Sequence, residues 1–126
     1  MTDGFAIVHP ADLPTDAFVT SEPTVTKLTE PLGCTEMRLN VVMLEPGEET
    51  ESHVHPGQEE VFLAQTDAEI EIDGTHHDVS EGSVVRVRED VPRNLVNTSE
   101  AAQQVWLAIG APPVGSVEDF GAFSKT

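Results

Sequence analysis

The stretch that decides the fold is residues 46–63, which reads PGEETESHVHPGQEEVFL. It holds two histidines, His53 and His55, separated by one residue. On an extended strand such a pair points to the same face, because side chains alternate from one face of a strand to the other. The turn residues Pro56 and Gly57 follow at once, so the next run of residues can fold back beside the two imidazoles.

An acidic residue at the start of the next apolar run completes a set of metal ligands. Glu60 stands directly before residues 61–63, and Glu59 is the alternative. Two imidazoles and one carboxylate suit a divalent transition metal ion such as Fe, Mn, Ni or Zn, and three protein ligands leave coordination positions open for water or substrate. The sequence therefore predicts one such ion at His53, His55 and Glu60. The alternative is that both histidines are surface residues beside a turn.

Short apolar runs and turn signals alternate along the rest of the chain. Within residues 67–73, Ala68, Ile70 and Ile72 fall on one face and glutamates on the other, as in a strand with one buried face. The dipeptide that follows, Asp73-Gly74, predicts a tight hairpin turn. This spacing predicts an all-β sandwich or barrel. Further strands are expected at 37–45, 61–66, 83–88 and 104–109, and short helical turns at 11–18 and 116–120.

Composition narrows the class of protein. A chain of 126 residues suits one domain, and its single cysteine, Cys34, excludes an internal disulfide framework. The balance of 23 Asp+Glu against 6 Lys+Arg gives a formal net charge of −17, which repels nucleic-acid phosphates and anionic lipids. No apolar run has the length of a membrane span or the setting of a signal peptide, so we expect a cytoplasmic protein. Because salt screens self-repulsion, we further expect a salt-rich cytoplasm; an ordinary acidic protein is the alternative.

The order of the ligand residues resembles the first motif of the cupin family. In that motif a glycine precedes a His-x-His pair, and a glutamate stands before the next strand. Gly47, His53, His55 and Glu60 take these places here, with Glu59 at the shorter spacing. The glycine that closes the motif has no counterpart, since Thr66 and Asp67 stand there.

The second cupin motif is matched less closely, over residues 82–97. Gly82 and Asn97 agree with it, but Arg93 stands where the family has a ligand histidine. An arginine stays protonated and has no lone pair to offer a metal. Either Arg93 lies beside a three-ligand metal site and binds an anionic group of the substrate, or Arg93 or Arg86 pairs with Glu60 and no metal binds.

The resemblance implies a jelly-roll β-barrel, with the barrel at residues 37–110, N-terminal strands or an arm at 1–36 and a C-terminal tail at 111–126. It implies a metal inside the barrel, a small-molecule ligand and a homodimer. The function expected is that of an oxygenase or isomerase acting on a small polar or anionic molecule; the alternative is a metal-free binding or sensor domain. The residues expected at the substrate are Arg93, Arg86, Phe62 and Trp106, of which the two aromatic residues also read as strand core.

Overall fold

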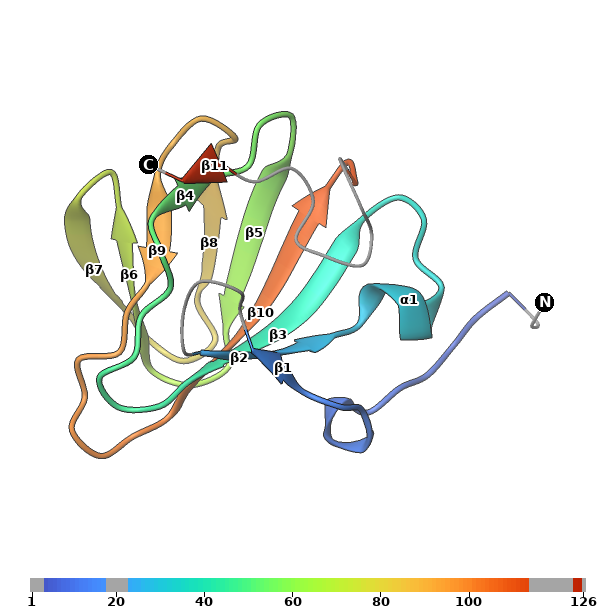
Figure 1. Cartoon of the computed structure of the whole chain (residues 1–126), viewed down its shortest axis with the longest axis horizontal. Helices are drawn as coiled ribbons and strands as arrows, with labels where there is room; N and C mark the ends of the chain where they lie inside the picture. Colours follow the sequence, from blue (N-terminus) through green and yellow to red (C-terminus); the bar gives the residue numbers. More distant parts are fainter. Residues whose placement is uncertain (1–3, 18–22, 114–123, 126) are drawn as a thin grey trace.

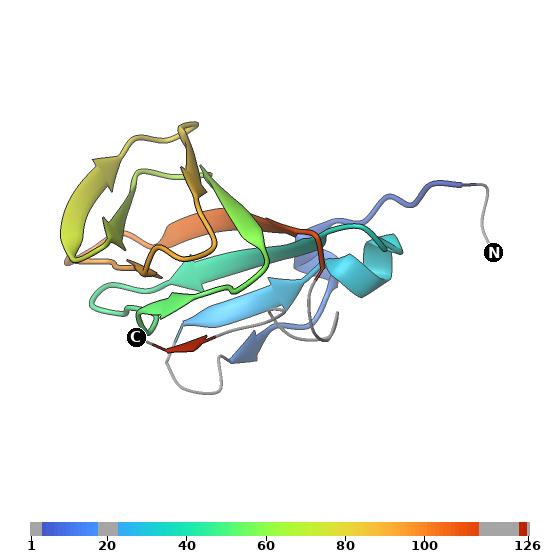
Figure 2. The same ribbon diagram turned by 90° about the horizontal axis from the view of Figure 1, so that it is seen from above.

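Two antiparallel sheets face each other in the computed structural model, which describes residues 4–17, 23–113 and 124–125 (Figures 1 and 2). The six-stranded sheet contains, in spatial order, β1 (Asp16–Ala17), β2 (Thr24–Lys27), β3 (Arg38–Leu44), β10 (Gln104–Ala111), β5 (Glu59–Ala64) and β8 (Val84–Val87). The five-stranded sheet contains β11 (Ser124–Lys125), β4 (His53–Val54), β9 (Arg93–Leu95), β6 (Ala68–Ile72) and β7 (Thr75–Val79). This arrangement confirms the predicted all-β jelly-roll fold.

Helical structure among the described residues is limited to two short segments, η1 (Pro10–Asp12) and α1 (Thr29–Leu32). The helical turn expected over residues 11–18 is therefore wrong for residues 13–17, and residue 18 lies outside the described residues. Leu13 is extended (φ −108°, ψ 153°), as expected for a residue that precedes a proline. The turn expected at 116–120 lies outside the described residues. Neither described helix has the length or apolar character needed to cross a membrane.

Turn chemistry sets where the central strands begin and end. Asp73 (φ 51°) and Gly74 (φ 80°) are both left-handed and join β6 to β7, as a tight hairpin requires. At Pro56-Gly57, the Gln58 N–H donates to the His55 carbonyl at 3.0 Å and Gly57 has φ 80°, so the chain reverses early. For this reason β5 begins at Glu59 rather than at the expected position 61.

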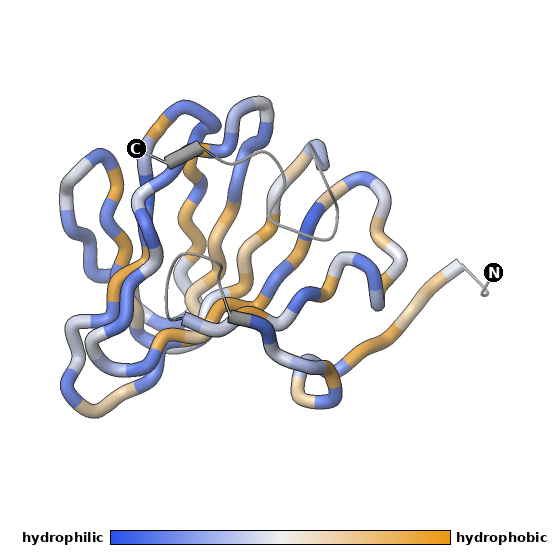
Figure 3. The backbone as a smooth tube through the Cα atoms, in the orientation of Figure 1, coloured by the Kyte–Doolittle hydropathy of each residue, from blue (hydrophilic) through white to orange (hydrophobic). Residues whose placement is uncertain are grey.

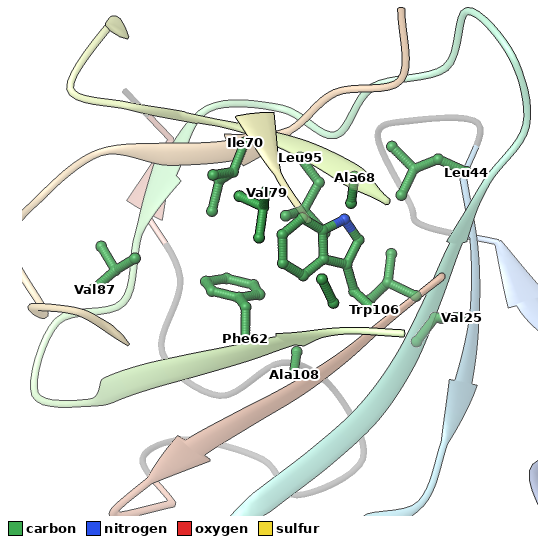
Figure 4. Packing of buried hydrophobic residues seen from close by; sticks show 12 residues of the cluster. Val25, Leu44, Phe62, Ala68, Ile70, Val79, Val87, Leu95, Trp106 and Ala108 are labelled. Carbon is green, nitrogen blue, oxygen red and sulfur yellow. The ribbon is translucent and has the colours of Figure 1, made fainter. Parts of the chain in front are cut away.

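Apolar side chains from both sheets fill one end of the barrel (Figure 4). Trp106 is fully buried, and its ring meets that of Phe62 edge to face, with centroids 5.9 Å apart. Apolar residues follow the central strands, while the turns that join them are polar (Figure 3). Burial of this cluster removes apolar surface from water and so holds the two sheets together.

The interior changes from apolar to polar along the strands of the six-stranded sheet. Trp106 of β10 pairs with Val42 and Ala64, whereas Gly110, four residues further along β10, pairs with Arg38 and Glu60. Inward-facing charged residues are therefore gathered at one end of the barrel, where Phe62, Leu95 and Ala108 of the hydrophobic cluster border them. The candidate site lies at this end.

Candidate metal and anion site

Three potential metal ligands converge between the sheets. His53 belongs to β4, His55 follows it, and Glu60 comes from β5 in the opposite sheet. Their ligand atoms all lie within 4.8 Å of one another. They border a cavity of about 30 Å³, whose polar lining is Asn40, Thr50, His53, His55, Glu60, Arg93 and Asn94.

The two imidazoles share one face of the chain, as their spacing predicts. Their ring centroids are 4.7 Å apart and the rings are nearly perpendicular, at 88°. His55 is 1% exposed, and the turn that starts at its carbonyl leads directly into β5. The short link through Pro56 and Gly57 thus brings Glu60 back to the histidines.

A backbone hydrogen bond fixes the tautomer of His53. Its Nδ1–H donates to the Glu51 carbonyl oxygen at 2.7 Å, so in the neutral ring the lone pair is on Nε2. Burial lowers the pKa of His53 to about 4, and the positive charges of Arg93 and Arg38 act in the same direction. His53 is therefore neutral near pH 7, as a metal ligand must be.

The carboxylate of Glu60 is buried and incompletely paired. Its Oε1 lies 3.5 Å from His55 Nε2 and has no hydrogen-bond partner among the described residues. Burial raises the pKa of Glu60 to about 7, although Arg93 and Arg38 pull it down. A buried acceptor without a partner, next to two imidazoles, is a donor set that fits a divalent metal ion.

Arg93 lies beside these three residues, on strand β9, which is the neighbour of β4 in the five-stranded sheet. It pairs with His53 in the β4–β9 register, and its Nη2 donates to the Arg88 carbonyl at 2.8 Å. Its Nε lies 3.8 Å from Glu60 Oε1, which is an ion pair without a hydrogen bond. Nε and Nη1 are buried and have no hydrogen-bond partner in the described part of the chain. The guanidinium is thus anchored at one nitrogen and has donors left for an anionic group.

Three of the expected site residues need correction. Glu59 points outward and accepts from Arg86 Nε at 2.6 Å, so Glu60 is the glutamate at the cavity. The Arg86 side chain is 60% exposed, because inward-facing Val85 and Val87 flank it on β8. Trp106 lies in the hydrophobic cluster and does not line the cavity, whereas Phe62 does.

Sequence reasoning missed Arg38 and Gln58, two buried polar residues behind the cavity. Arg38 is 2% exposed and Gln58 is fully buried. Arg38 Nη2 lies 3.8 Å from Glu60 Oε2, and Arg38 Nε donates to Gln58 Oε1 at 3.1 Å. Period-two alternation from Val42 back to Arg38 would have placed the arginine on the inward face, but not beside Glu60.

A second cluster of possible ligands lies on the surface of the β6–β7 hairpin. Glu69, His76 and Asp78 bring their ligand atoms within 4.8 Å of one another. His76 Nε2 lies 2.8 Å from Glu69 Oε1, and this hydrogen bond raises the pKa of His76. Thr98 and Gln104 also donate to the Glu69 carboxylate. These partners already satisfy Glu69, so we treat the cluster as a surface ion-pair network.

Comparisons with known proteins agree with the fold described above. The family model "Cupin domain" matches residues 40–110. A sugar phosphate isomerase of the cupin superfamily from Silicibacter pomeroyi has a TM-score of 0.74 at 19% identity, over 83% of this chain and 74% of that one. A predicted oxalate decarboxylase from Thermotoga maritima has a TM-score of 0.69 at 15% identity, over 84% and 98% of the two chains.

A polyketide cyclase from Streptomyces resistomycificus is similar to the same degree, with a TM-score of 0.70 at 18% identity over 83% of this chain and 78% of that one. No curated protein matches the chain. At these identities the solved structures show the shared fold. Cupins commonly bind a divalent metal, and the His53, His55 and Glu60 set is in keeping with that. Because the matched region spans more than half of the 126 residues, the chain belongs to the cupin domain family.

Proposed function

We propose that this protein is a metal-dependent cupin that acts on a small polar or anionic molecule. The observation that carries the proposal is that the ligand atoms of His53, His55 and Glu60 lie within 4.8 Å of one another, beside Arg93, two of whose buried nitrogens have no hydrogen-bond partner among the described residues. In this proposal the three residues hold one Fe, Mn, Ni or Zn ion. A bound ion of this kind supplies Lewis-acid or oxygen-dependent chemistry, as isomerases and oxygenases use.

The residues of the chain prepare the site for such a ligand. The Glu51 carbonyl orients the ring of His53, and burial keeps that ring neutral. Arg93 presents two N–H donors to the anionic end of the substrate, where a carboxylate can accept both. Phe62 lines the cavity with an apolar surface beside these polar groups.

The size of the cavity limits what can enter it. Its volume of about 30 Å³ exceeds the roughly 10–15 Å³ that one water molecule needs. A cavity of this size has room for an ion or a small polar group but not for a whole larger substrate. This favours substrates that insert a single carboxylate, hydroxyl or carbonyl group.

The alternative is a metal-free binding or sensor domain, and one observation favours it. Both Arg93 and Arg38 lie 3.8 Å from Glu60, on different oxygens of its carboxylate. In this alternative the two guanidinium groups balance that negative charge in place of a metal ion. In this alternative Arg93 still binds an anionic ligand, and the histidines only line the cavity.

Metal analysis separates the two functions. Protein purified without chelator or affinity tag should contain near-stoichiometric metal by elemental analysis, and His53→Ala should lose it. His77→Ala is the matched control, since His77 is exposed on β7 and should leave the metal content unchanged. If wild-type protein is purified metal-free and takes up none of the four ions, the metal-dependent function is contradicted and the metal-free binding or sensor domain is supported.

We also propose a homodimer, formed through the outward face of the six-stranded sheet. The register places half-buried apolar residues side by side there: Leu39 and Met43 of β3, Val105, Leu107 and Ile109 of β10, and Val61 and Leu63 of β5. The acidic Glu59 of β5 also points outward, but it is paired with Arg86, so two copies can meet here with little opposing charge. Sedimentation should give a dimer that Leu107→Lys converts to monomer. A wild-type monomer at every concentration would contradict this.

The acidic composition supports a salt-rich cytoplasm as the setting in which the protein works. Its formal net charge is −17, and the six basic residues are too few to neutralise the acidic ones. A high ionic strength screens repulsion between the acidic residues. Thermal unfolding in KCl tests this proposal, since the melting temperature should rise with the salt concentration.

A further inference from the structure

One row of the six-stranded sheet places an arginine and the candidate ligand Glu60 on either side of a glycine. Gly110 of β10 pairs with Arg38 of β3 on one side and with Glu60 of β5 on the other. Arg38 is 2% exposed and Glu60 is 4% exposed, so both side chains are enclosed. The space above Gly110 is therefore the route by which the guanidinium can reach the carboxylate.

The absence of a side chain at position 110 keeps this route open. A Cβ atom built on Gly110 would lie 2.7 Å from Gln58 Cδ and 2.9 Å from Arg38 Nη2, which are closer than real contacts allow. The reason for glycine here is thus the passage of neighbouring side chains across the strand. Any larger residue would displace Gln58, Arg38 or both.

Arg38 is held in place by Gln58 and is aimed at one oxygen of Glu60. Its Nε donates to Gln58 Oε1 at 3.1 Å, its Nη2 donates to the same oxygen, and Gln58 Nε2 donates to the Pro112 carbonyl at 3.0 Å. Arg38 Nη2 lies 3.8 Å from Glu60 Oε2, whereas Arg93 Nε lies 3.8 Å from Oε1. The two cations therefore constrain the plane of the carboxylate from different sides.

We propose that Arg38 is a positioning residue that acts across Gly110. It attracts the Oε2 side of Glu60 and so leaves Oε1 directed at His55 Nε2, 3.5 Å away, and at the cavity. Its effect on metal binding rests on the proposed function, but its effect on the carboxylate does not need a metal. Partners of this kind, one step behind a ligand, typically change metal affinity 10–100-fold when removed.

The test uses Arg38→Gln, with Arg38→Lys and Gly110→Ala as second variants. In a crystal structure of metal-free Arg38→Gln, the Glu60 carboxylate should have turned away from His55. In Co²⁺ titrations, Arg38→Gln and Gly110→Ala should bind roughly 10–100-fold more weakly than wild type, with an altered visible spectrum. Arg38→Lys keeps the charge without the planar guanidinium. Its Co²⁺ affinity should lie between those of the wild type and Arg38→Gln.

Arg86→Gln is the matched control, because Arg86 also pairs with a glutamate of β5 but is exposed. It should bind Co²⁺ like the wild type. The inference is overturned if Glu60 keeps its position in Arg38→Gln, or if Gly110→Ala shows wild-type affinity and spectrum. If wild-type protein binds no metal, the proposed function fails, while the position of Glu60 in metal-free Arg38→Gln still decides the role of Arg38.

Discussion

The Nε atom of Arg93 lies 3.8 Å from the Oε1 atom of Glu60, and neither atom has a hydrogen-bond partner among the described residues. Both atoms are buried. A buried polar group left without a partner costs about 1–3 kcal/mol, and more when it is charged. An anionic group placed against Arg93 would supply the acceptors that the described residues do not provide.

Arg93 should therefore control the binding of small carboxylates even in metal-free protein. Malonate is expected to raise the melting temperature of chelator-treated wild type, since a ligand of the folded state stabilises it. Arg93→Gln should weaken malonate binding roughly 10–100-fold, as expected for the loss of charge-assisted hydrogen bonds worth about 1.5–3 kcal/mol. Calorimetric titration gives the affinities.

Arg86→Gln provides the comparison, because that side chain is exposed and paired with Glu59. It should bind malonate as the wild type does. Equal binding by Arg93→Gln and wild type would remove Arg93 from the ligand site.

Glu60 makes the metal-free protein less stable as the pH rises. Burial raises the pKa of Glu60 from 4.5 to about 7, so the folded state keeps a proton that the unfolded state releases. The free energy of unfolding should then fall between pH 4.5 and 7, by roughly 3 kcal/mol at 1.36 kcal/mol per pKa unit. Glu60→Gln cannot ionise and should gain this amount relative to wild type between pH 4 and pH 8.

Urea unfolding at a series of pH values, with chelator present, measures this difference. His53 acts in the opposite direction, because burial lowers its pKa from 6.5 to about 4 and stability is lost as the pH falls through that range. His53 is present in both proteins, so subtracting the two curves isolates Glu60. Parallel curves for the two proteins would show that Glu60 titrates normally.

Local pattern predicted much of the fold and the convergence of the three candidate ligands. The Asp73-Gly74 turn, the same-face pair His53 and His55, and the return of Glu60 after Pro56-Gly57 depend on neighbours in sequence, and the structure shows all of them. The outward position of Arg86 could also have been predicted from the sequence, because inward-facing Val85 and Val87 flank it.

The environment of Glu60 could not be predicted in this way. Arg38 and Glu60 belong to strands that are separated in space by β10, which comes from the distant end of the barrel sequence. Only the register of three strands reveals that Gly110 lies between them. Trp106 was expected at the substrate for a related reason. Strand alternation identifies which residues face inward, but not how far along the barrel they lie.

Trp106 should support stability without affecting the site. It is fully buried beside Phe62, and its Nε1–H has no hydrogen-bond partner among the described residues. Trp106→Phe creates a cavity but removes this unsatisfied donor, so we expect a loss of about 1–2 kcal/mol, less than the 3–5 kcal/mol typical of Trp→Ala. Malonate affinity should stay at the wild-type value.

Phe62→Leu is the contrasting variant, because Phe62 lines the cavity. It should lower both stability and malonate affinity. A change in malonate affinity in Trp106→Phe, at unchanged affinity in Phe62→Leu, would reverse the two assignments.

Salt should stabilise the protein, because repulsion among the acidic residues outweighs the few ion pairs that salt weakens. The exposed pairs Arg86–Glu59 and Arg88–Asp90 lose attraction in salt, but pairs of this kind contribute only about 0–1 kcal/mol each. The formal net charge of −17 acts over the whole surface, and the screening length falls from about 10 Å at 0.1 M salt to about 3 Å at 1 M. The melting temperature should therefore rise steadily from dilute buffer to molar KCl.

Sucrose is the control for this prediction, because it stabilises proteins by exclusion from their surface without screening charge. A melting temperature that stays flat or falls across the KCl series would contradict a salt-rich setting, since the net repulsion would then be too weak to matter.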